Sequence, residues 1–195
     1  DFSNTYGKNS FLYTIVNTYN ASMQKASPTF FDAGGFSFAQ NTTNLDISKF
    51  YDDVMSGLNV AFGAEYRVEN YEIVAGEEPS YAQYTATGEV IKTSDQDPSV
   101  DFFGNSRPGG SQVFPGFSPA NELLRGRSSV AGYVDVEADV TEGFLLSGAL
   151  RFEDYSDFGS TLNGKIATRV KAGENTNIRA AFNTGFRAPS LHQLN

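Results

Sequence analysis

The sequence has no cysteine and no tryptophan, and its 195 residues include one histidine, His192. Without thiols the chain forms no disulfides, carries no thiolate nucleophile and offers no Cys-based zinc site. A single histidine cannot build a His-rich metal cluster, and the sequence shows no oriented partner that would make His192 a base for the nearby Ser190. We therefore expect no enzyme, no bound metal and no cofactor.

Long apolar runs are also missing. No stretch approaches the roughly 18 consecutive apolar residues of a membrane helix, so only β-strands, which need about 9–11 residues, remain for a membrane protein. Basic residues are in the minority, and the net charge of −9 has the wrong sign for binding nucleic-acid phosphates. The chain starts at Asp1 without the basic and apolar regions of a signal peptide, and we expect any such peptide to have been removed.

What the sequence does contain is alternation of apolar and polar residues at strand length. In the clearest case Leu58, Val60 and Phe62 share one parity, while Glu65 and Arg67 belong to the other. Period-two alternation places the two sets on opposite faces of a sheet. This pattern predicts strands at residues 58–74, 129–140, 144–155, 161–172 and 177–187. A further strand at 9–22 is predicted from its β-branched and aromatic residues, and a less regular one with a bulge at 36–49, which gives seven strands.

The connections between these strands differ in length from one end to the other. Short turns are expected at 51–57, 141–143 and 173–176, and longer loops at 23–35, 75–127 and 156–160. Outer-membrane barrels have short turns on one side and long loops on the other, although a β-sandwich can also gather its functional loops at one end. The apolar face is therefore either the core of a soluble sandwich or the lipid-facing surface of a barrel.

The charged parity changes sign along the predicted sheet. It is acidic first, then mixed, and basic in the last two strands: Asp135, Glu137 and Asp139; Arg151 and Glu153; Lys165, Arg169, Lys171, Arg179 and Arg187. On a solvated face this gradient needs no explanation. Inside a barrel it would form a polarised wall.

The connection 75–127 is rich in proline and glycine, and loops of this length are usually functional or disordered. Its aromatic and arginine side chains are candidates for a ligand surface: Tyr81, Tyr84, Phe102, Phe103, Arg107, Phe114, Phe117 and Arg125. Aromatic faces stack on sugars or catecholates, and arginine binds carboxylates. The alternative is that these residues pack the loop against itself. Asp95, Asp97 and Asp101 offer oxygen ligands suited to calcium, or are simply solvated.

Four stretches resemble TonB-dependent outer-membrane receptors of Gram-negative bacteria. GFRAPSLHQL (185–194) is similar to a strand end of that family, and GAEYRVENYEI (63–73) with AGEEPSY (75–81) to a strand and loop entrance. SGALRFEDYSDFGSTLNGKIATRV (147–170) resembles one of its hairpins. These segments are spread over most of the chain.

The resemblance implies an all-β fold, an antiparallel up-and-down meander of about seven strands that is part of a 22-stranded transmembrane β-barrel. No segment resembles the family's plug domain or TonB box, so residues 1–195 would be a partial barrel domain and 75–127 a long extracellular loop. The implied function is TonB-dependent uptake of siderophore-bound iron, cobalamin or a glycan across the outer membrane. The alternative function is a soluble β-sandwich that binds carbohydrate through its long loop.

The resemblance also implies partners, namely the plug domain of the same parent chain, the TonB system, outer-membrane lipid and a small solute. The residues expected to face the lumen or plug are Glu65, Arg67, Glu69, Asp135, Glu137, Arg151, Glu153, Lys165, Arg169, Arg179 and Arg187.

Overall fold

Seven β-strands make up a single sheet in the computed structural model, which describes residues 1–193. The strands are β1 (Phe2–Val16), β2 (Phe30–Tyr51), β3 (Leu58–Val74), β4 (Leu123–Thr141), β5 (Phe144–Tyr155), β6 (Gly159–Gly173) and β7 (Thr176–Asn183). The helical elements are short: α1 (Glu78–Tyr81) and the 3₁₀ turns η1 (Ala21–Ala26), η2 (Pro119–Asn121) and η3 (Leu191–Gln193). No helix among the described residues is long and apolar enough to cross a membrane.

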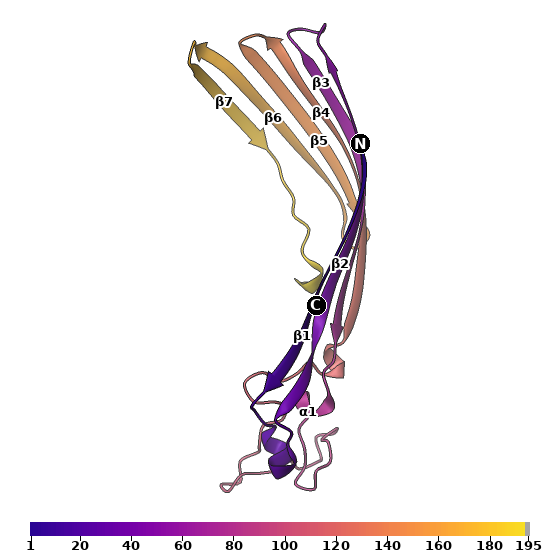
Figure 1. Ribbon diagram of the computed structural model, residues 1–195, viewed down its shortest axis with the longest axis vertical. Coiled ribbons are helices and arrows are strands. Elements are labelled where there is room, and N and C mark those ends of the chain that lie inside the picture. The colour runs from indigo at the N-terminus through magenta and orange to yellow at the C-terminus, as the bar shows by residue number, and fades with distance from the viewer. Residues whose placement is uncertain (194–195) are drawn as a thin grey trace. The chain divides into compact units, whose positions relative to one another are not determined.

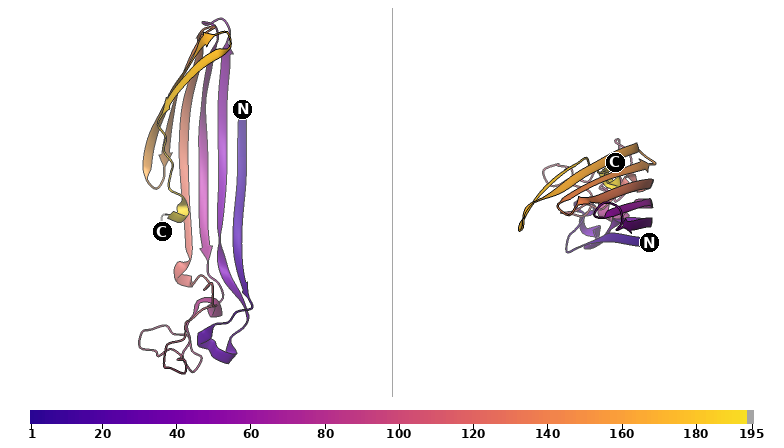
Figure 2. Two further views of the ribbon diagram at one scale, coloured as in Figure 1. Left: turned by 90° about the vertical axis from the view of Figure 1, so that its left-hand side faces the viewer. Right: turned by 90° about the horizontal axis from the view of Figure 1, so that it is seen from above.

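Each strand lies beside the next one along the chain, in the order β1 to β7 (Figure 2). The pairs β4–β5, β5–β6 and β6–β7 are antiparallel, and their registers bring Val134 opposite Leu150, and Leu150 opposite Gly164. The predicted antiparallel meander of seven strands is confirmed. A β-sandwich needs two packed sheets, and the described residues contain one, which does not fit the soluble alternative.

The strand ends differ from the prediction where local geometry overrides the pattern. β5 has the predicted bounds, but β1 stops at Val16 because Asn17 adopts a left-handed φ of 58° and Asn20 then caps η1. β7 stops at Asn183 instead of residue 187. Alternation continues beyond the end of β7 to Phe186, so it does not report where hydrogen bonding to the neighbouring strand stops.

The chain divides into two units. Unit 1 comprises residues 1–7, 40–69 and 126–195, and unit 2 comprises residues 8–39 and 70–125. Unit 1 therefore contains β5, β6 and β7, which lie side by side in Figure 1. Unit 2 contains α1 and most of the long connection between β3 and β4.

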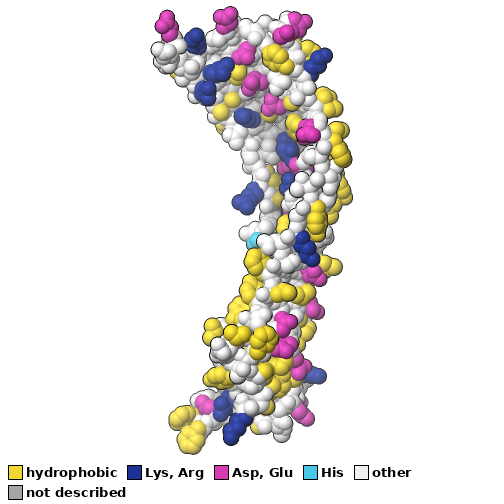
Figure 3. Space-filling model, in the orientation of Figure 1, with side chains coloured by type: hydrophobic (Ala, Val, Ile, Leu, Met, Phe, Trp, Pro, Cys, Tyr) yellow, Lys and Arg dark blue, Asp and Glu magenta, His cyan; other side chains and the backbone are white. Residues whose placement is uncertain are grey.

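In the unit 1 sheet the apolar face is exposed and part of the charged face is buried, which is the reverse of a soluble protein. On the apolar face Leu150, Ile166 and Phe182 are 54%, 55% and 70% exposed. On the charged face Ser129 and Ala131 are buried. In Figure 3, Lys and Arg side chains gather over β6 and β7, and apolar side chains project along the right-hand edge of the same unit. A water-soluble sheet normally buries its apolar face. The exposed apolar face of this unit therefore fits an environment other than water.

A side-chain hydrogen bond in unit 1 connects two strands across the strand that lies between them, at Gly63. The Tyr133 hydroxyl on β4 donates a 2.6 Å hydrogen bond to Asp46 Oδ1 on β2, and its ring lies over Gly63 on the intervening β3. A Cβ at Gly63 would be 2.6 Å from Tyr133 Cε1 and 2.7 Å from Asp46 Oδ1. Only glycine leaves room for this crossing.

Unit 2 is organised around buried polar side chains. Asn20 is fully buried; its Nδ2 donates to the carbonyls of Pro79 (2.9 Å) and Ala82 (2.8 Å). Its Oδ1 accepts from the backbone N–H of Ser22 (3.1 Å) and from the Ser22 hydroxyl (2.6 Å). The Asn20 amide thus uses both donors and both acceptor positions, which ties η1 to the long connection.

More serines extend this polar core. The Ser99 hydroxyl donates to the Ser22 carbonyl at 2.9 Å, and the Ser111 hydroxyl donates to the Phe114 carbonyl at 2.7 Å. Gly34, with φ 76°, sits against the backbone of Gly76, where a Cβ would be 2.6 Å from the amide nitrogen. The long connection is therefore a folded structure with defined contacts.

Candidate functional site

The charged face of unit 1 holds a chain of ion pairs across three neighbouring strands. Glu65 on β3 binds Arg67 Nη2 through Oε1 at 2.7 Å and Arg151 Nη2 through Oε2 at 3.4 Å. Arg151 also binds Glu153 Oε1 at 2.9 Å. The Arg151–Glu65 pair spans β4, where Ala131 presents only a methyl group. Four of the residues predicted to share one face are brought together as a charge-balanced group.

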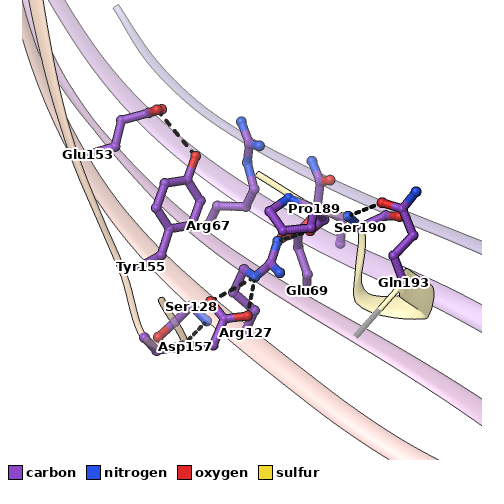
Figure 4. A network of polar contacts seen from close by, with 12 residues as sticks. Arg67, Glu69, Arg127, Ser128, Glu153, Tyr155, Asp157, Pro189, Ser190 and Gln193 are labelled. Atoms are coloured by element: carbon purple, nitrogen blue, oxygen red, sulfur yellow. Dashed lines mark hydrogen bonds and ion pairs between the residues drawn. The ribbon is translucent and has the colours of Figure 1, made fainter. Parts of the chain in front are cut away.

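Arg127 at the start of β4 forms a second group with residues from three other segments (Figure 4). Its Nε lies 2.9 and 3.0 Å from the two oxygens of Asp157, its Nη1 donates to the Pro189 carbonyl at 2.9 Å, and Glu69 Oε2 is 3.7 Å from Nη1. The Arg127 side chain is 2% exposed. Its guanidinium carbon lies 5.3 Å from the Phe158 ring centroid and 5.9 Å from that of Tyr155.

The basic end of the charged face is less completely paired. Arg169 on β6 binds Asp139 at 3.2 Å and stands directly opposite Arg179 on β7. Like charges in that relation are unfavourable. Glu137, Lys165, Arg169 and Arg179 line one shallow hollow of this face. Among the described residues, no ion-pair partner lies within 4.0 Å of Asp135, Glu137, Lys165, Arg179 or Arg187.

Part of the loop aromatics lies inside unit 2. Tyr84 is buried with its hydroxyl 3.4 Å from Glu78 Oε1; burial, and then the charge of Glu78, raises the pKa of Tyr84 to about 12. Phe117 is half-buried and Phe114 is still 38% exposed; their rings lie 6.3 and 5.2 Å from the ring of Tyr13. Tyr81 on α1 is half-buried.

Other candidates of the loop remain on the surface. Phe102 and Phe103 are 95% and 83% exposed and meet edge to face at 5.4 Å. Asp101 holds their turn, because its carboxylate accepts from the backbone N–H groups of Phe103 (2.9 Å) and Asn105 (2.8 Å), and the Asn105 bonds lower the Asp101 pKa. Arg107 donates to the Val100 carbonyl at 3.0 Å, and Arg125 is exposed.

The sequence offered one candidate metal site and one candidate catalytic pair. Within residues 1–193 no group of three acidic or histidine side chains is placed to hold a metal ion, so the structure does not gather Asp95, Asp97 and Asp101 into a calcium site. Ser190 Oγ lies 3.3 Å from His192 Nε2, on or next to the turn η3.

Arg127, Asp157 and the Tyr133–Asp46 pair were not predicted from the sequence as functional residues. Arg127 fell at the boundary between loop and strand, where a single arginine has no periodic signal. The one available hint was Asp157 within the RFEDYSDFG stretch, since that stretch carried the family resemblance.

A single meander with an exposed apolar face and an ion-paired opposite face is the architecture of an outer-membrane β-barrel wall. The family model described as TonB dependent receptor-like, beta-barrel matches residues 1–195, and the chain belongs to this family of outer-membrane receptors and transporters. The resemblance found in the sequence is confirmed.

One curated relative is the ferric enterobactin receptor PirA of Pseudomonas aeruginosa. It is 32% identical over 89 residues, which are 44% of this chain and 12% of that receptor. The match thus spans a small part of the relative's length. No solved structure matches the chain.

Proposed function

We propose that this chain forms part of the barrel wall of a receptor that takes up a small external solute across the outer membrane, with energy supplied through TonB. The observation that carries the proposal is the distribution of side chains in unit 1, where apolar side chains are exposed and charged side chains pair with each other. In a membrane barrel the first face meets lipid and the second lines the lumen. Residues 1–195 are then one partial barrel domain, and 75–127 is an extracellular loop.

For the solute we propose a ferric siderophore, ahead of cobalamin and glycans. The name of the curated relative supports this class. The exposed pair Phe102 and Phe103, with the arginines Arg107 and Arg125, offers aromatic faces and positive charge to a solute. A catecholate chelate of iron is both aromatic and anionic, and it fits such a surface. Tyr81, Tyr84, Phe114 and Phe117 would then support the loop from within.

Uptake by the full-length receptor tests the proposal. A strain lacking the gene is grown under iron limitation with ferric enterobactin as the iron source, and parallel cultures test cobalamin and glycan use. Restoration of growth on the siderophore alone by the wild-type gene is expected. The double variant Phe102→Ala/Phe103→Ala should raise the siderophore concentration needed by about tenfold, as expected when two ring contacts of about 0.5–1.5 kcal/mol each are lost.

The matched control is Phe50→Ala, an exposed ring near the end of β2 in unit 1. It should leave uptake unchanged. Growth on cobalamin or a glycan alone would replace the siderophore with that solute class, and no uptake of any of the three would reject the receptor function.

We further propose that the basic end of the charged face docks an acidic surface of the plug domain. The support is the direct opposition of Arg169 and Arg179, of which Asp139 neutralises one. Amine labelling of Lys165 in the full-length receptor should be slower than in a plug-deleted form. Labelling of the exposed Lys25 is the control and should not differ. Equal rates at Lys165 would argue against docking there.

A further inference from the structure

The segment that follows β7 leaves the sheet but stays attached to unit 1. Thr184 is the last residue in the β6 ladder, where its N–H donates to the Gly164 carbonyl and its hydroxyl accepts from the Gly164 N–H, both at 2.9 Å. Residues 185–193, which we call the strap, then run irregularly to the turn η3. Figure 1 shows this segment, in yellow, separating from the strands after β7.

Two apolar contacts hold the strap. Phe186 lies 5.4 Å from Phe158 and 6.5 Å from Tyr155, and the latter two rings stack at 4.4 Å. Leu191 is 3% exposed, although its neighbours His192 and Gln193 are exposed. The strap is therefore fixed at both its beginning and its end.

The third attachment is polar and comes from Arg127. The Pro189 carbonyl accepts from Arg127 Nη1 at 2.9 Å, while Nε of the same guanidinium is held by Asp157 (Figure 4). The guanidinium carbon lies over the Phe158 ring, 5.3 Å from its centroid. Asp157 and Phe158 belong to the β5–β6 connection, and Glu69 belongs to β3. One buried cation thus joins the start of β4, two other parts of the sheet and the strap.

The Arg127 contact is incomplete. Its Nη2 is buried and has no hydrogen-bond partner. A buried donor without an acceptor is unfavourable, so the attached state of the strap is less stable than a fully satisfied one would be. Such a contact can open locally at a lower free energy than a network in which every buried donor is satisfied.

We propose that Arg127 is a positioning residue that latches the strap onto the charged face of the sheet, and that the strap has a released state in which Leu191 becomes accessible. This inference rests on the proposed function for its consequence, because the charged face is the lumen side of the barrel. A latched strap then occupies part of the lumen, and its release changes the width of the passage.

Cysteine labelling tests the latch directly, because residues 1–195 contain no cysteine and any cysteine elsewhere in the receptor is first replaced by serine. In the full-length receptor, Leu191→Cys should react slowly with a maleimide, and His192→Cys should react quickly and define the rate of an exposed site. Combining Leu191→Cys with Arg127→Met, which keeps an unbranched stem and removes the charge, should raise its rate by about tenfold. That change corresponds to losing one charge-assisted hydrogen bond in the opening equilibrium.

Three further variants separate positioning from general stability. Arg127→Lys keeps an ion pair but not the planar fork, so an intermediate rate is expected. Phe186→Ala should also raise the rate, because it removes the other attachment. Lys49→Met removes an exposed cation near the end of β2 that belongs to no proposed binding surface, and it should leave the labelling rate unchanged. Heat-modified gel mobility of each variant verifies that the barrel is folded.

Fast labelling of Leu191→Cys in the otherwise unchanged receptor, or equally slow labelling with Arg127→Met in a folded barrel, would overturn the latch. Labelling is measured without any solute. A failure of the latch therefore leaves the uptake assay untouched, and a failure of uptake leaves the labelling result interpretable.

Discussion

A side chain at Gly63 would clash with the ring of Tyr133, which occupies the space above this residue. The hydroxyl reaches Asp46 two strands away, with a short 2.6 Å bond to a carboxylate. Hydrogen bonds to charged groups contribute about 1.5–3 kcal/mol, more than neutral ones. This single contact links β2, β3 and β4 in a way that backbone pairing alone does not.

We expect Tyr133→Phe to lower the free energy of unfolding by about 1.5–3 kcal/mol, since it removes the donor and leaves the Asp46 carboxylate uncompensated. The measurement is denaturant unfolding of the receptor in lipid bilayers. Tyr66→Phe, on an exposed ring of the other parity, is the control and should change stability by less than about 0.5 kcal/mol. Equal effects of the two substitutions would show that the Asp46 bond contributes nothing.

Tyr84 gives unit 2 a dependence on alkaline pH. Its pKa is raised from 10.0 to about 12 in the folded chain, so the folded state holds the phenolic proton more tightly than the unfolded state. The resulting stabilisation is complete below pH 10 and is lost as the pH rises through about 12. Spectrophotometric titration should show a late-ionising tyrosine that is missing in Tyr84→Phe. A titration curve unaltered at its alkaline end would contradict this.

At the scale of single strands, β5 offers adjacent positions that face different surroundings. Leu150 belongs to the exposed apolar face and Ala149 to the charged one. Leu150→Arg should cost about 2–4 kcal/mol if it meets lipid near the bilayer midplane. Ala149→Arg, its matched control, should cost much less because the lumen is polar. Folding into bilayers measures both, and equal penalties would mean that the faces are wrongly assigned.

The existence and order of all seven strands were predicted from the sequence, and the period-two pattern predicted β3 to β7 and the bounds of β5. It succeeded there because each residue of a two-faced strand is constrained by its own environment. It did not predict the end of β7, because Phe186 leaves the ladder for a contact with Phe158 that lies far away in sequence. Tertiary contacts of this kind leave no periodic trace.

The candidate site was predictable to a similar extent. Alternation assigned Glu65, Arg67, Arg151 and Glu153 to one face, and the structure brings them into ion pairs. The latch of Arg127 was not predictable, because its partners come from three separate segments. Composition also gave no means of separating buried Tyr84 from exposed Phe102.

For the whole chain, the exposed apolar face of unit 1 determines behaviour outside a membrane. Exposed side chains such as Leu150, Ile166 and Phe182 form a surface that monomeric soluble proteins rarely leave uncovered. Within the described sheet, β1 and β7 each have one neighbouring strand, so the outer edge of each is open to pairing with another chain.

The 195-residue chain, expressed alone and without lipid or detergent, should therefore self-associate. Sedimentation velocity should give a broad distribution of large species, and added detergent micelles should convert it to a narrow one. A monodisperse monomer in buffer would contradict the assignment of the apolar face to lipid.

The buried side chains of unit 2 have a thermodynamic consequence. Asn20, Ser22, Ser80, Ser99 and Ser111 are its most buried polar members, and they stand where most domains place aliphatic groups. Exposing polar surface lowers the heat capacity of unfolding, whereas exposing apolar surface raises it. The free energy of unfolding of this unit should consequently curve less with temperature than that of a unit with an aliphatic core. Cooling, which weakens hydrophobic cores, should leave its hydrogen-bonded interior nearly as stable as at the temperature of growth.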